Sequence, residues 1–451
     1  STPLVTFIGQ VERSFLGREA FQEVDLAAYF KHLCKWTVEI DDVNRIPELV
    51  HRAFHVARSG RPGPVVVSLP QDMLMEWTEA GEHKPLMMSP VHPDPKAIEE
   101  ICEELVKAKR PIVIAGGGVI RSGASRALVQ LAERLNIPVA TAFRRFDAFP
   151  NTHPNYIGSL GIGAPAYLLE YIQQADLIVV LGSRLSQITS KNYTLFTKQQ
   201  KFIHVDIDPE VFGKWLAPDL AVVADARLAV DMLLEVSKEI EPSAREVSIA
   251  DLRKQYIAYS TPQPSYSDEY VDMEGMLHDF IQHLPEDVVI TSDAGNFYGW
   301  LARYLRFNGK LSYVGPTSGA MGYGLPAALG VKLAQPEKTV ISFSGDGGFM
   351  MTMQELETAM RWNIPVVSIV VNNNMYGTIR MHQEREFPNR VIATDLTNPD
   401  FGELAKVFGV HGERVERNAD FIPAFKRALA ANKPALIEVK TNPKILSAFV
   451  K

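Results

Sequence analysis

Short apolar runs rich in β-branched residues alternate along the chain with segments whose apolar residues recur at helical spacing. The runs predict buried strands and the spaced segments predict helices, because each period places side chains on one face of its element. Strands are expected at 3–10, 65–70, 111–115, 177–181, 202–208, 288–291, 339–343 and 366–371, and clear helices at 46–57 and 353–360. This alternation is typical of an α/β fold with parallel, doubly wound sheets.

Two polar segments, 79–95 and 241–268, divide the chain into three parts. The predicted domains are therefore 1–80, 96–240 and 269–451. A chain of 451 residues agrees with this number, because domains average about 150 residues. A hydrophobic content of 46% is sufficient for sizeable cores.

The charges exclude several classes of function. The net charge of −7 is spread over mixed acidic and basic residues, so neither nucleic acid nor a membrane surface is an expected partner.

No apolar run has the length of a membrane span and no signal peptide is recognised, so we expect a cytoplasmic protein. Cys34 and Cys102 lie outside any CxxC motif, which argues against structural zinc, and both are expected to be buried thiols.

The most informative stretch is Gly345-Asp346-Gly347-Gly348, which follows one predicted strand, together with Asn372-Asn373-Asn374, which follows the next. Parallel strands place such segments at one edge of the sheet, where ligands bind. The helix expected at 353–360 would bring the glycine amides near a helix N-terminus, which attracts anions. We interpret the pair of motifs as a cradle for a metal-bound diphosphate.

Three oxygen donors at these motifs suit Mg²⁺. They are the Asp346 carboxylate, the Asn373 side-chain amide and the Met375 carbonyl. Mg²⁺ prefers such hard oxygen ligands and completes its octahedron with phosphate and water. Either motif alone is more simply a loop or a turn, and only their combination favours a metal site.

These residues resemble the signature of the thiamine-diphosphate (ThDP) enzymes of the acetolactate synthase and pyruvate oxidase type. The resemblance implies three doubly wound α/β domains, the first of them incomplete. It also implies that Asp346, Asn373 and Met375 hold Mg²⁺. The implied cofactor-binding residues are Gly345, Asp346, Gly347, Gly348, Asn373, Met375 and Tyr376.

Two further segments match the same family. In 315–328, the resemblance implies that Met321 wedges under the cofactor and forces its two rings into a folded V, and that the Gly319 carbonyl accepts from the aminopyrimidine. The alternative for Met321 is an ordinary core methionine. Gly295 and Asn296 fall where the family has another diphosphate contact, although Asn296 is equally suited to a turn or helix cap.

Residues 1–80 resemble the second half of the family's pyrimidine-binding domain. The family's proton-relay glutamate would precede Ser1, so we assign it to no residue. An omitted upstream region, a separate polypeptide and a loss of activity all remain open. Because family sites lie between subunits, a homodimer or homotetramer is expected. Gln10, Phe21 and Gln22 are candidates to line the partner's site, with a structural glutamine as the alternative.

The reaction implied by the resemblance is decarboxylation and carboligation of a 2-ketoacid such as pyruvate. Arg380 and His382 lie in the family's substrate segment, where His382 replaces a tryptophan of typical acetolactate synthases. Arg380 could bind a substrate carboxylate or only pair with Glu384, and His382 could donate a proton or be a solvated residue. Another ThDP lyase or transferase, acting on an acyl-CoA or on sulfoacetaldehyde, and a non-catalytic ThDP-binding protein are the alternatives.

FAD is uncertain. The central part carries Gly116-Gly117-Gly118, Gly182-Ser183-Arg184 and Asp206-Ile207-Asp208, which resemble flavin-contacting positions of acetolactate synthase. The continuation at 185–188 departs from the charged family pattern. An adenine nucleotide or no ligand remain open for this domain.

Overall fold

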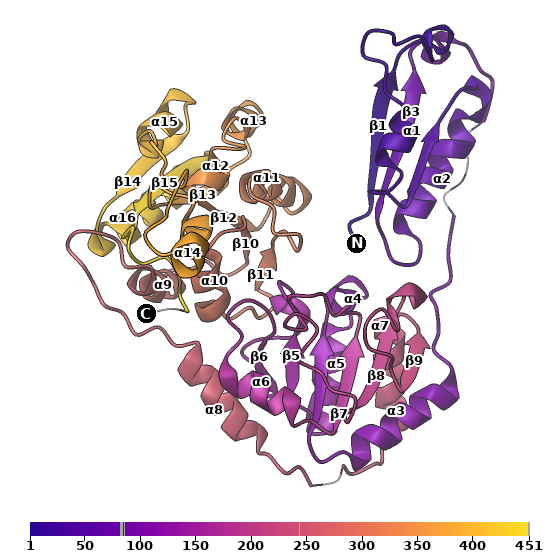
Figure 1. The fold of residues 1–451 in the computed structure, drawn as a ribbon, viewed down its shortest axis with the longest axis vertical. Helices are drawn as coiled ribbons and strands as arrows, with labels where there is room; N and C mark the ends of the chain where they lie inside the picture. Colours follow the sequence, from indigo (N-terminus) through magenta and orange to yellow (C-terminus); the bar gives the residue numbers. More distant parts are fainter. Residues whose placement is uncertain (82–83, 85, 243, 450–451) are drawn as a thin grey trace. The chain divides into compact units, whose positions relative to one another are not determined.

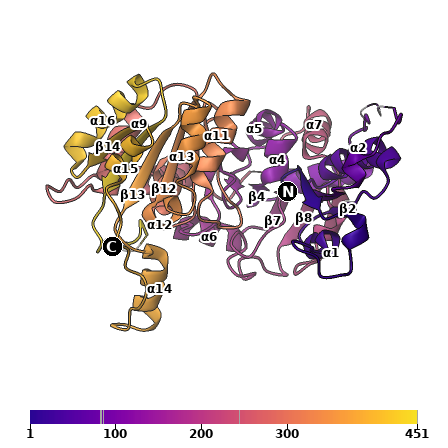
Figure 2. The same cartoon turned by 90° about the horizontal axis from the view of Figure 1, so that it is seen from above.

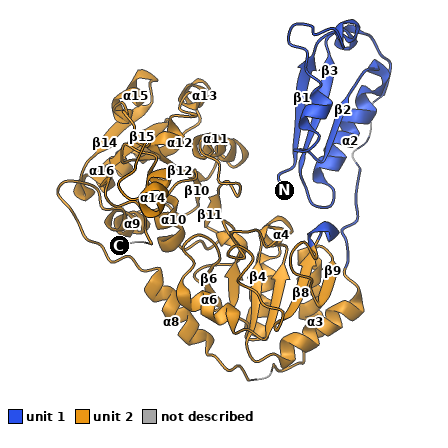
Figure 3. Ribbon diagram, viewed as in Figure 1, with its two compact units in different colours: residues 1–92, 207–211 blue, residues 93–206, 212–451 orange. Residues whose placement is uncertain are grey.

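The structure, a computed structural model, describes residues 1–81, 84, 86–242 and 244–449. The chain forms two compact units (Figure 3), one of residues 1–92 with 207–211 and one of residues 93–206 with 212–451. Parts of the two predicted polar segments, at 82–83, 85 and 243, and the final residues 450–451 lie outside the described residues.

The first unit contains a three-stranded parallel sheet in the order β1-β3-β2. Helix α2 packs on this sheet through Leu49, Ala53 and Ala57, which recur every fourth residue and are buried. The strands are β1 Leu4–Gln10, β2 Trp36–Glu39 and β3 Pro64–Pro70. The helices are α1 Leu26–Phe30 and α2 Ile46–Arg58, with short 3₁₀ turns η1 Arg13–Phe15, η2 Val43–Arg45, η3 Met73–Met75 and η5 Pro209–Val211.

The second unit begins with a six-stranded parallel sheet in the order β6-β5-β4-β7-β8-β9. Successive residues of its strands point to opposite faces of the sheet, and each face has its own hydrophobic core. Val113 packs toward α3, α5 and α7, whereas Ile112 and Ile114 pack toward α6. The strands are β4 Pro111–Ala115, β5 Val139–Thr141, β6 Tyr156–Ser159, β7 Leu177–Leu181, β8 Lys201–Asp206 and β9 Leu220–Val223. The helices are α3 Pro95–Lys107, α4 Gly117–Arg121, α5 Ser125–Arg134, η4 Phe146–Ala148, α6 Ala166–Gln173 and α7 Ala226–Val236.

The described residues of the predicted connector 241–268 include a helix. This helix is α8 Ile249–Tyr259, which lies beside the central sheet (Figure 1). Leu252 and Tyr256, one helical turn apart, are buried in the two cores of that sheet. The intervening residues are mostly polar, and for this reason the sequence pattern did not reveal the helix.

A second six-stranded parallel sheet, in the order β11-β10-β12-β13-β15-β14, forms the C-terminal part. One of its faces is covered by α9, α10 and α16 and the other by α11, α13 and α15, as the cores show. Helix α14 projects from this body (Figure 2). The strands are β10 Val288–Ser292, β11 Leu311–Val314, β12 Thr339–Gly345, β13 Val367–Asn372, β14 His411–Val415 and β15 Ala435–Lys440. The helices are α9 Met273–Gln282, α10 Tyr298–Tyr304, α11 Gly324–Ala334, α12 Asp346–Phe349, α13 Glu355–Arg361, α14 Gly377–Glu386, α15 Phe401–Val407 and α16 Asn418–Ala430.

The predicted class is confirmed, since all three sheets are parallel and flanked by helices. The helix expected at 353–360 is α13, Glu355–Arg361, and a separate short helix, α12, lies before it and begins at Asp346. The amides of Gly347 and Gly348 therefore belong to the first turn of α12, which is anchored by the buried Phe349.

Across the described residues, none of the helices combines the length and apolar character that crossing a bilayer requires. Cys102 is buried on α3, as expected, and its burial raises the pKa of its thiol. Cys34 is only half-buried, so the expectation of two buried thiols was wrong for that residue.

Candidate active site

The two motifs predicted to hold a metal meet at the carboxyl end of the C-terminal sheet. Strands β12 and β13 run parallel, with Gly345 opposite Val371. Asp346 follows the first strand directly, and Asn372 ends the second. The backbone N–H of Met375 donates to Asp346 Oδ2 at 3.2 Å, so the two motifs are in direct contact.

Asp346 is a buried carboxylate, only 3% exposed. Its Oδ1 accepts from the Gly347 amide at 3.0 Å, and its Oδ2 accepts from Asn398 Nδ2 at 2.8 Å. Burial raises the pKa of the Asp346 carboxyl, against the lowering effect of these hydrogen bonds. No Lys, Arg or His of the described residues forms an ion pair with it. A divalent cation would supply the countercharge that such a buried carboxylate needs.

The loop after β13 is shaped by the first asparagine of the motif. Asn372 Oδ1 accepts from the Asn374 amide at 2.9 Å, and Asn374 has a left-handed φ of 57°. A bridge between Met375 and Asp395 closes the loop. Within the described part of the chain, the Asn373 side chain has no hydrogen-bond partner, so its Oδ1 is available to a ligand. The Met375 carbonyl accepts from the Gly377 amide at 2.9 Å and keeps its second lone pair.

The glycines of the first motif are required by close packing. A Cβ at Gly347 would lie 2.5 Å from the Tyr376 ring, and one at Gly348 would lie 2.4 Å from Asp293 Oδ2. Gly345 is less restricted, because a Cβ there would make an ordinary 3.4 Å contact with Phe297. These glycines therefore bring Tyr376 and Asp293 against the start of α12.

The second predicted block lies next to the first. Gly319 has a left-handed φ of 75° and open space at its Cβ position. Met321 is 36% exposed, so it is not an ordinary core methionine. The Ala294 amide donates to the Ala320 carbonyl at 3.1 Å, which ties this block to the loop after β10.

The loop after β10 also contacts α14. Asn296 Oδ1 accepts from Thr378 Oγ1 at 3.0 Å, and Asn296 Nδ2 lies 3.5 Å from Met381 Sδ. Helix α10 begins after Phe297 with no side-chain cap, so Asn296 is not a cap there. Gly295 adopts a φ of 150°, which favours glycine.

Helix α14 carries the two predicted substrate residues. Arg380 forms ion pairs with Glu384 and Asp395, both at 3.3 Å. The first of these is the i,i+4 pair considered as the alternative for Arg380. His382 is exposed, and its Nδ1 lies 3.0 Å from Arg385 Nη2.

Comparison with known proteins shows the family to which the chain belongs. Residues 293–439 match the family described as thiamine pyrophosphate enzyme, C-terminal TPP binding domain, and residues 98–233 match its central domain. The chain belongs to the thiamine pyrophosphate enzymes. Thiamine pyrophosphate is another name for ThDP, so the predicted family is confirmed.

Similar proteins carry acetolactate synthase names. A probable acetolactate synthase large subunit of Methanocaldococcus jannaschii is 31% identical, over 98% of this chain and 77% of the relative. The acetolactate synthase isozyme 3 large subunit of Escherichia coli is also 31% identical, over 95% of this chain and 77% of the relative. An acetolactate synthase of Mycobacterium bovis is 32% identical, over 97% of this chain and 73% of the relative.

The donor set of this thiamine pyrophosphate enzyme fits the cofactor and its metal. Among the described residues, no three His, Cys, Asp or Glu side chains converge as a metal site. Beside the buried Asp346 carboxylate, this edge of the sheet instead offers neutral amide and carbonyl oxygens, and two further buried carboxylates, Asp293 and Glu438, lie nearby. That combination suits Mg²⁺ bound together with a diphosphate, which contributes further oxygens. The Gly347 amide is already used by Asp346, so the Gly348 amide is the better diphosphate donor.

The predicted glutamines lie in the first unit. Gln10, at the end of β1, is buried, and its Nε2 donates to the Val24 carbonyl at 2.6 Å. This is the structural alternative considered for a glutamine. Gln22 is exposed and lies in a turn with a φ of 66°, not on a helix. Phe21 beside it is 88% exposed.

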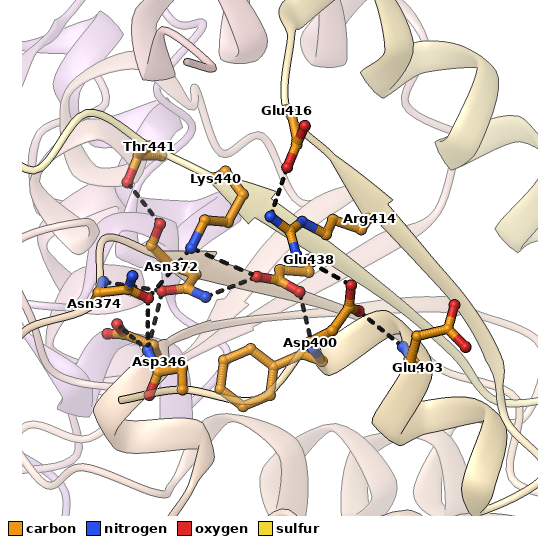
Figure 4. Close-up of polar contacts among 12 residues, drawn as sticks. Asp346, Asn372, Asn374, Asp400, Glu403, Arg414, Glu416, Glu438, Lys440 and Thr441 are labelled. Carbon is orange, nitrogen blue, oxygen red and sulfur yellow. Dashed lines mark hydrogen bonds and ion pairs between the residues drawn. The ribbon is translucent and has the colours of Figure 1, made fainter. Parts of the chain in front are cut away.

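Four residues that contact the site were not identified from the sequence. Asn398 Nδ2 lies within hydrogen-bonding distance of Asp346, Asn372 and Asn374. Glu438 and Lys440, on β15, join the same group of contacts (Figure 4). A glutamate between apolar residues in a strand was the one available signal for Glu438. The fourth residue is Arg144.

Arg144 connects the central domain to the site. It is buried, and its Nη2 donates to the Asp293 carbonyl and its Nη1 to the Tyr313 hydroxyl, both at 3.1 Å. Its guanidinium lies 4.0 Å from the centre of the Tyr298 ring. These contacts fix the loop after β10 against which Gly348 packs.

The glycines considered for flavin binding are required by the close packing of two loops. A Cβ at Gly116 would lie 2.3 Å from the Gly182 carbonyl oxygen, and one at Gly118 would lie 2.6 Å from the Gly182 Cα. The loops after β4 and β7 therefore require glycine whether or not a ligand binds.

Proposed function

We propose that this thiamine pyrophosphate enzyme uses ThDP and Mg²⁺ to decarboxylate a 2-ketoacid such as pyruvate and to join the remaining fragment to a second carbonyl compound. The observation that carries the proposal is the buried Asp346 carboxylate, without an ion-pair partner among the described residues, beside the oxygens of Asn373 and Met375. The acetolactate synthase names of similar proteins support the choice of substrate.

The metal would be held by the Asp346 carboxylate, Asn373 Oδ1 and the Met375 carbonyl. The Gly348 amide and Asn296 would bind the diphosphate, and Gly345, Gly347 and Tyr376 would line it. When bound, ThDP supplies an acidic carbon that adds to the substrate carbonyl and accepts the electron pair left when CO₂ departs. The exposed Met321 side chain would contact the cofactor and keep its two rings folded, and the Gly319 carbonyl would accept a hydrogen bond that orients the aminopyrimidine.

The substrate would be bound at α14. A guanidinium binds a carboxylate through two parallel hydrogen bonds, so Arg380 would exchange its ion pair with Asp395 for the ketoacid carboxylate. The exposed His382 would donate or hold a proton near the acceptor. In a homodimer or homotetramer, the exposed Gln22 would reach the site of a second copy, and Gln10 would do so only by giving up its hydrogen bond to the Val24 carbonyl.

Activity on a panel of substrates tests the proposal. Purified protein with ThDP and Mg²⁺ is incubated with pyruvate, 2-ketobutyrate, oxalyl-CoA and sulfoacetaldehyde, and products are identified by mass spectrometry. Release of CO₂ from pyruvate with formation of acetolactate is the expected result. Activity only on a CoA thioester or on sulfoacetaldehyde would displace the ketoacid, and ThDP binding with no turnover of any substrate would favour a non-catalytic protein. Flavin absorbance of the same sample decides whether FAD is bound.

A further inference from the structure

Strand β15 carries a buried carboxylate next to the metal site. Glu438 is 1% exposed and lies among the apolar residues 435–439 in the interior of the sheet. In register, Glu438 lies opposite Val370 of β13 and Arg414 of β14. Side chains at opposed positions of parallel strands share a face, so Glu438 faces α15, the helix that covers this face.

Both oxygens of Glu438 accept hydrogen bonds. Oε1 accepts from Asn372 Nδ2 at 2.7 Å, and Oε2 accepts from the Phe401 amide at 2.8 Å. Lys440 Nζ lies 3.9 Å from Oε1 and supplies a nearby positive charge. A buried carboxylate is stable only when it is hydrogen-bonded and compensated in this way.

The carboxylate determines the orientation of the Asn372 amide. An ionised carboxylate only accepts hydrogen bonds, so the NH₂ group of Asn372 must face Glu438 and the Oδ1 atom must face away. Oδ1 then accepts from the Asn374 amide at 2.9 Å and from Asn398 Nδ2 at 3.0 Å. The first bond bends the loop that carries Asn373 and Met375.

Asn398 transmits this orientation to the proposed metal ligand. The Nδ2 atom that donates to Asn372 also lies 2.8 Å from Asp346 Oδ2. One continuous set of hydrogen bonds therefore runs from Glu438 through Asn372 and Asn398 to Asp346. Figure 4 labels Glu438, Asn372 and Asp346 of this set.

We propose that Glu438 is a positioning residue for the metal site, acting on Asp346 and on the loop 373–375 through the amides of Asn372 and Asn398. The inference rests on the proposed function, because it concerns the Mg²⁺ that would bind ThDP there. A purely structural Glu438 would hold only the start of α15 through the Phe401 amide. The two roles differ in whether the affinity for Mg²⁺ changes.

Glu438→Gln is the direct test. Both partners of the carboxylate are donors, so a glutamine amide can accept from only one of them and directs its NH₂ group at the other. We expect the Mg²⁺ concentration that half-saturates ThDP binding to rise by about tenfold or more, as for the loss of one hydrogen bond to a buried charged group. ThDP binding is measured by titration calorimetry, and thermal unfolding without cofactor reports the fold.

The double variant N372D/E438Q reverses the roles of the pair. The new carboxylate at position 372 accepts from the amide at 438 and still accepts from Asn374 and Asn398, while the amide oxygen at 438 still accepts from Phe401. We expect its Mg²⁺ midpoint to return to within about threefold of the wild type. N372D alone places two carboxylates at a 2.7 Å contact and should weaken Mg²⁺ binding.

Glu413→Gln is the matched control. Glu413 lies in the neighbouring strand β14 and bonds His411 and Arg427, without contact to Asn372 or Asp346 among the described residues. This variant should lose stability and keep the wild-type Mg²⁺ midpoint. Equal midpoints for E438Q, E413Q and wild type would overturn the inference.

If E438Q does not fold, Asn398→Ala tests whether the hydrogen bonds that Asn398 makes to Asn372 and Asp346 affect Mg²⁺ binding. Asn398 is half-buried in a loop, so truncation there is tolerated more readily than in β15. We expect a weakened Mg²⁺ midpoint, and an unchanged midpoint would overturn the inference. If the wild type itself shows no Mg²⁺-dependent ThDP binding, the proposed function fails. If the wild type shows Mg²⁺-dependent ThDP binding and the variants have the same Mg²⁺ midpoint, only the proposed role of Glu438 fails.

Discussion

Asp346 illustrates, at the scale of single residues, how burial assigns a role to a common side chain. Its carboxylate is 3% exposed and accepts hydrogen bonds only from neutral donors among the described residues. Charge of this kind is costly in a protein interior unless a cation is present. The neighbouring oxygens of Asn373 and Met375 complete the proposed set of ligands.

Asp346→Ala should abolish Mg²⁺-dependent retention of ThDP, because the metal would lose the one carboxylate of its proposed set of ligands. Titration calorimetry with Mg²⁺ present should show a loss of at least about 100-fold in affinity, comparable to removing a buried charged partner. Asp346→Asn keeps the shape of the side chain but removes its charge, so it should also weaken Mg²⁺-dependent ThDP binding. Unchanged affinity in D346A would mean that the metal site lies elsewhere.

His204 should make the stability of the protein pH-dependent. Its ring is buried in β8, and burial lowers the pKa to about 4, although the hydrogen bond to the Ser183 carbonyl, 2.8 Å from Nε2, opposes this shift. An unfolded histidine titrates near pH 6.5, so below that pH the unfolded state binds a proton that the folded state excludes. Stability is therefore complete above about pH 7 and falls as the pH decreases toward 4, by about 2 kcal/mol between pH 7 and pH 5.

Urea unfolding at pH 7 and pH 5 measures this dependence. His204→Asn should reduce the difference between the two pH values by about 2 kcal/mol. His92→Asn, at an exposed histidine, is the control and should leave it unchanged. An equal pH dependence in H204N and wild type would contradict the assignment.

Sequence reasoning at this scale found residues that belong to short motifs and missed those brought in by the fold. Asp346, Asn373 and Met375 lie in two segments whose spacing is visible in the chain. Asn398 and Glu438 are separated from Asp346 by 52 and 92 positions. Glu438 reaches its surroundings because β13 and β15 pair, and Asn398 does so from the loop before α15. Periodicity cannot reveal a contact of that kind.

At the scale of elements, the buried strands were the most predictable feature. β4 and β7 have the predicted bounds, because a run of apolar residues between polar ends has few alternatives. Helix α12 was missed because its four residues, Asp346–Phe349, include two glycines, which are poor helix formers. Helix α8 was missed because only Leu252 and Tyr256 mark its buried face.

The presence of Leu252 in the core predicts that α8 contributes to stability. Leu252→Ala should lower the free energy of unfolding by about 2–5 kcal/mol, as for other fully buried leucines. Lys254→Ala, at an exposed position of the same helix, should change it by less than about 0.5 kcal/mol. Urea denaturation of both variants checks this, and a leucine variant as stable as the lysine variant would show that the segment is only a connector.

At the scale of the whole molecule, the three parallel sheets agree with the thiamine pyrophosphate enzyme family. The C-terminal part leaves apolar side chains exposed around the proposed site, including Met321, Met351 and Ile379. Exposed apolar side chains of this kind are typical of surfaces that contact another chain.

We therefore expect the purified protein to form dimers or tetramers. Sedimentation equilibrium at micromolar concentration should give two or four times the chain mass of 50.2 kDa. Addition of ThDP and Mg²⁺ should favour the assembled form, because a ligand bound between subunits stabilises their contact. A monomer under both conditions would exclude a site shared between copies.

Calorimetric titration of ThDP into the wild-type protein, with Mg²⁺ present and after its chelation, tests the central claim most directly. Saturable binding that is lost on chelation, and lost in D346A with Mg²⁺ present, is the predicted result. Equally tight binding after chelation, or no binding under either condition, would contradict a metal-held diphosphate at Asp346.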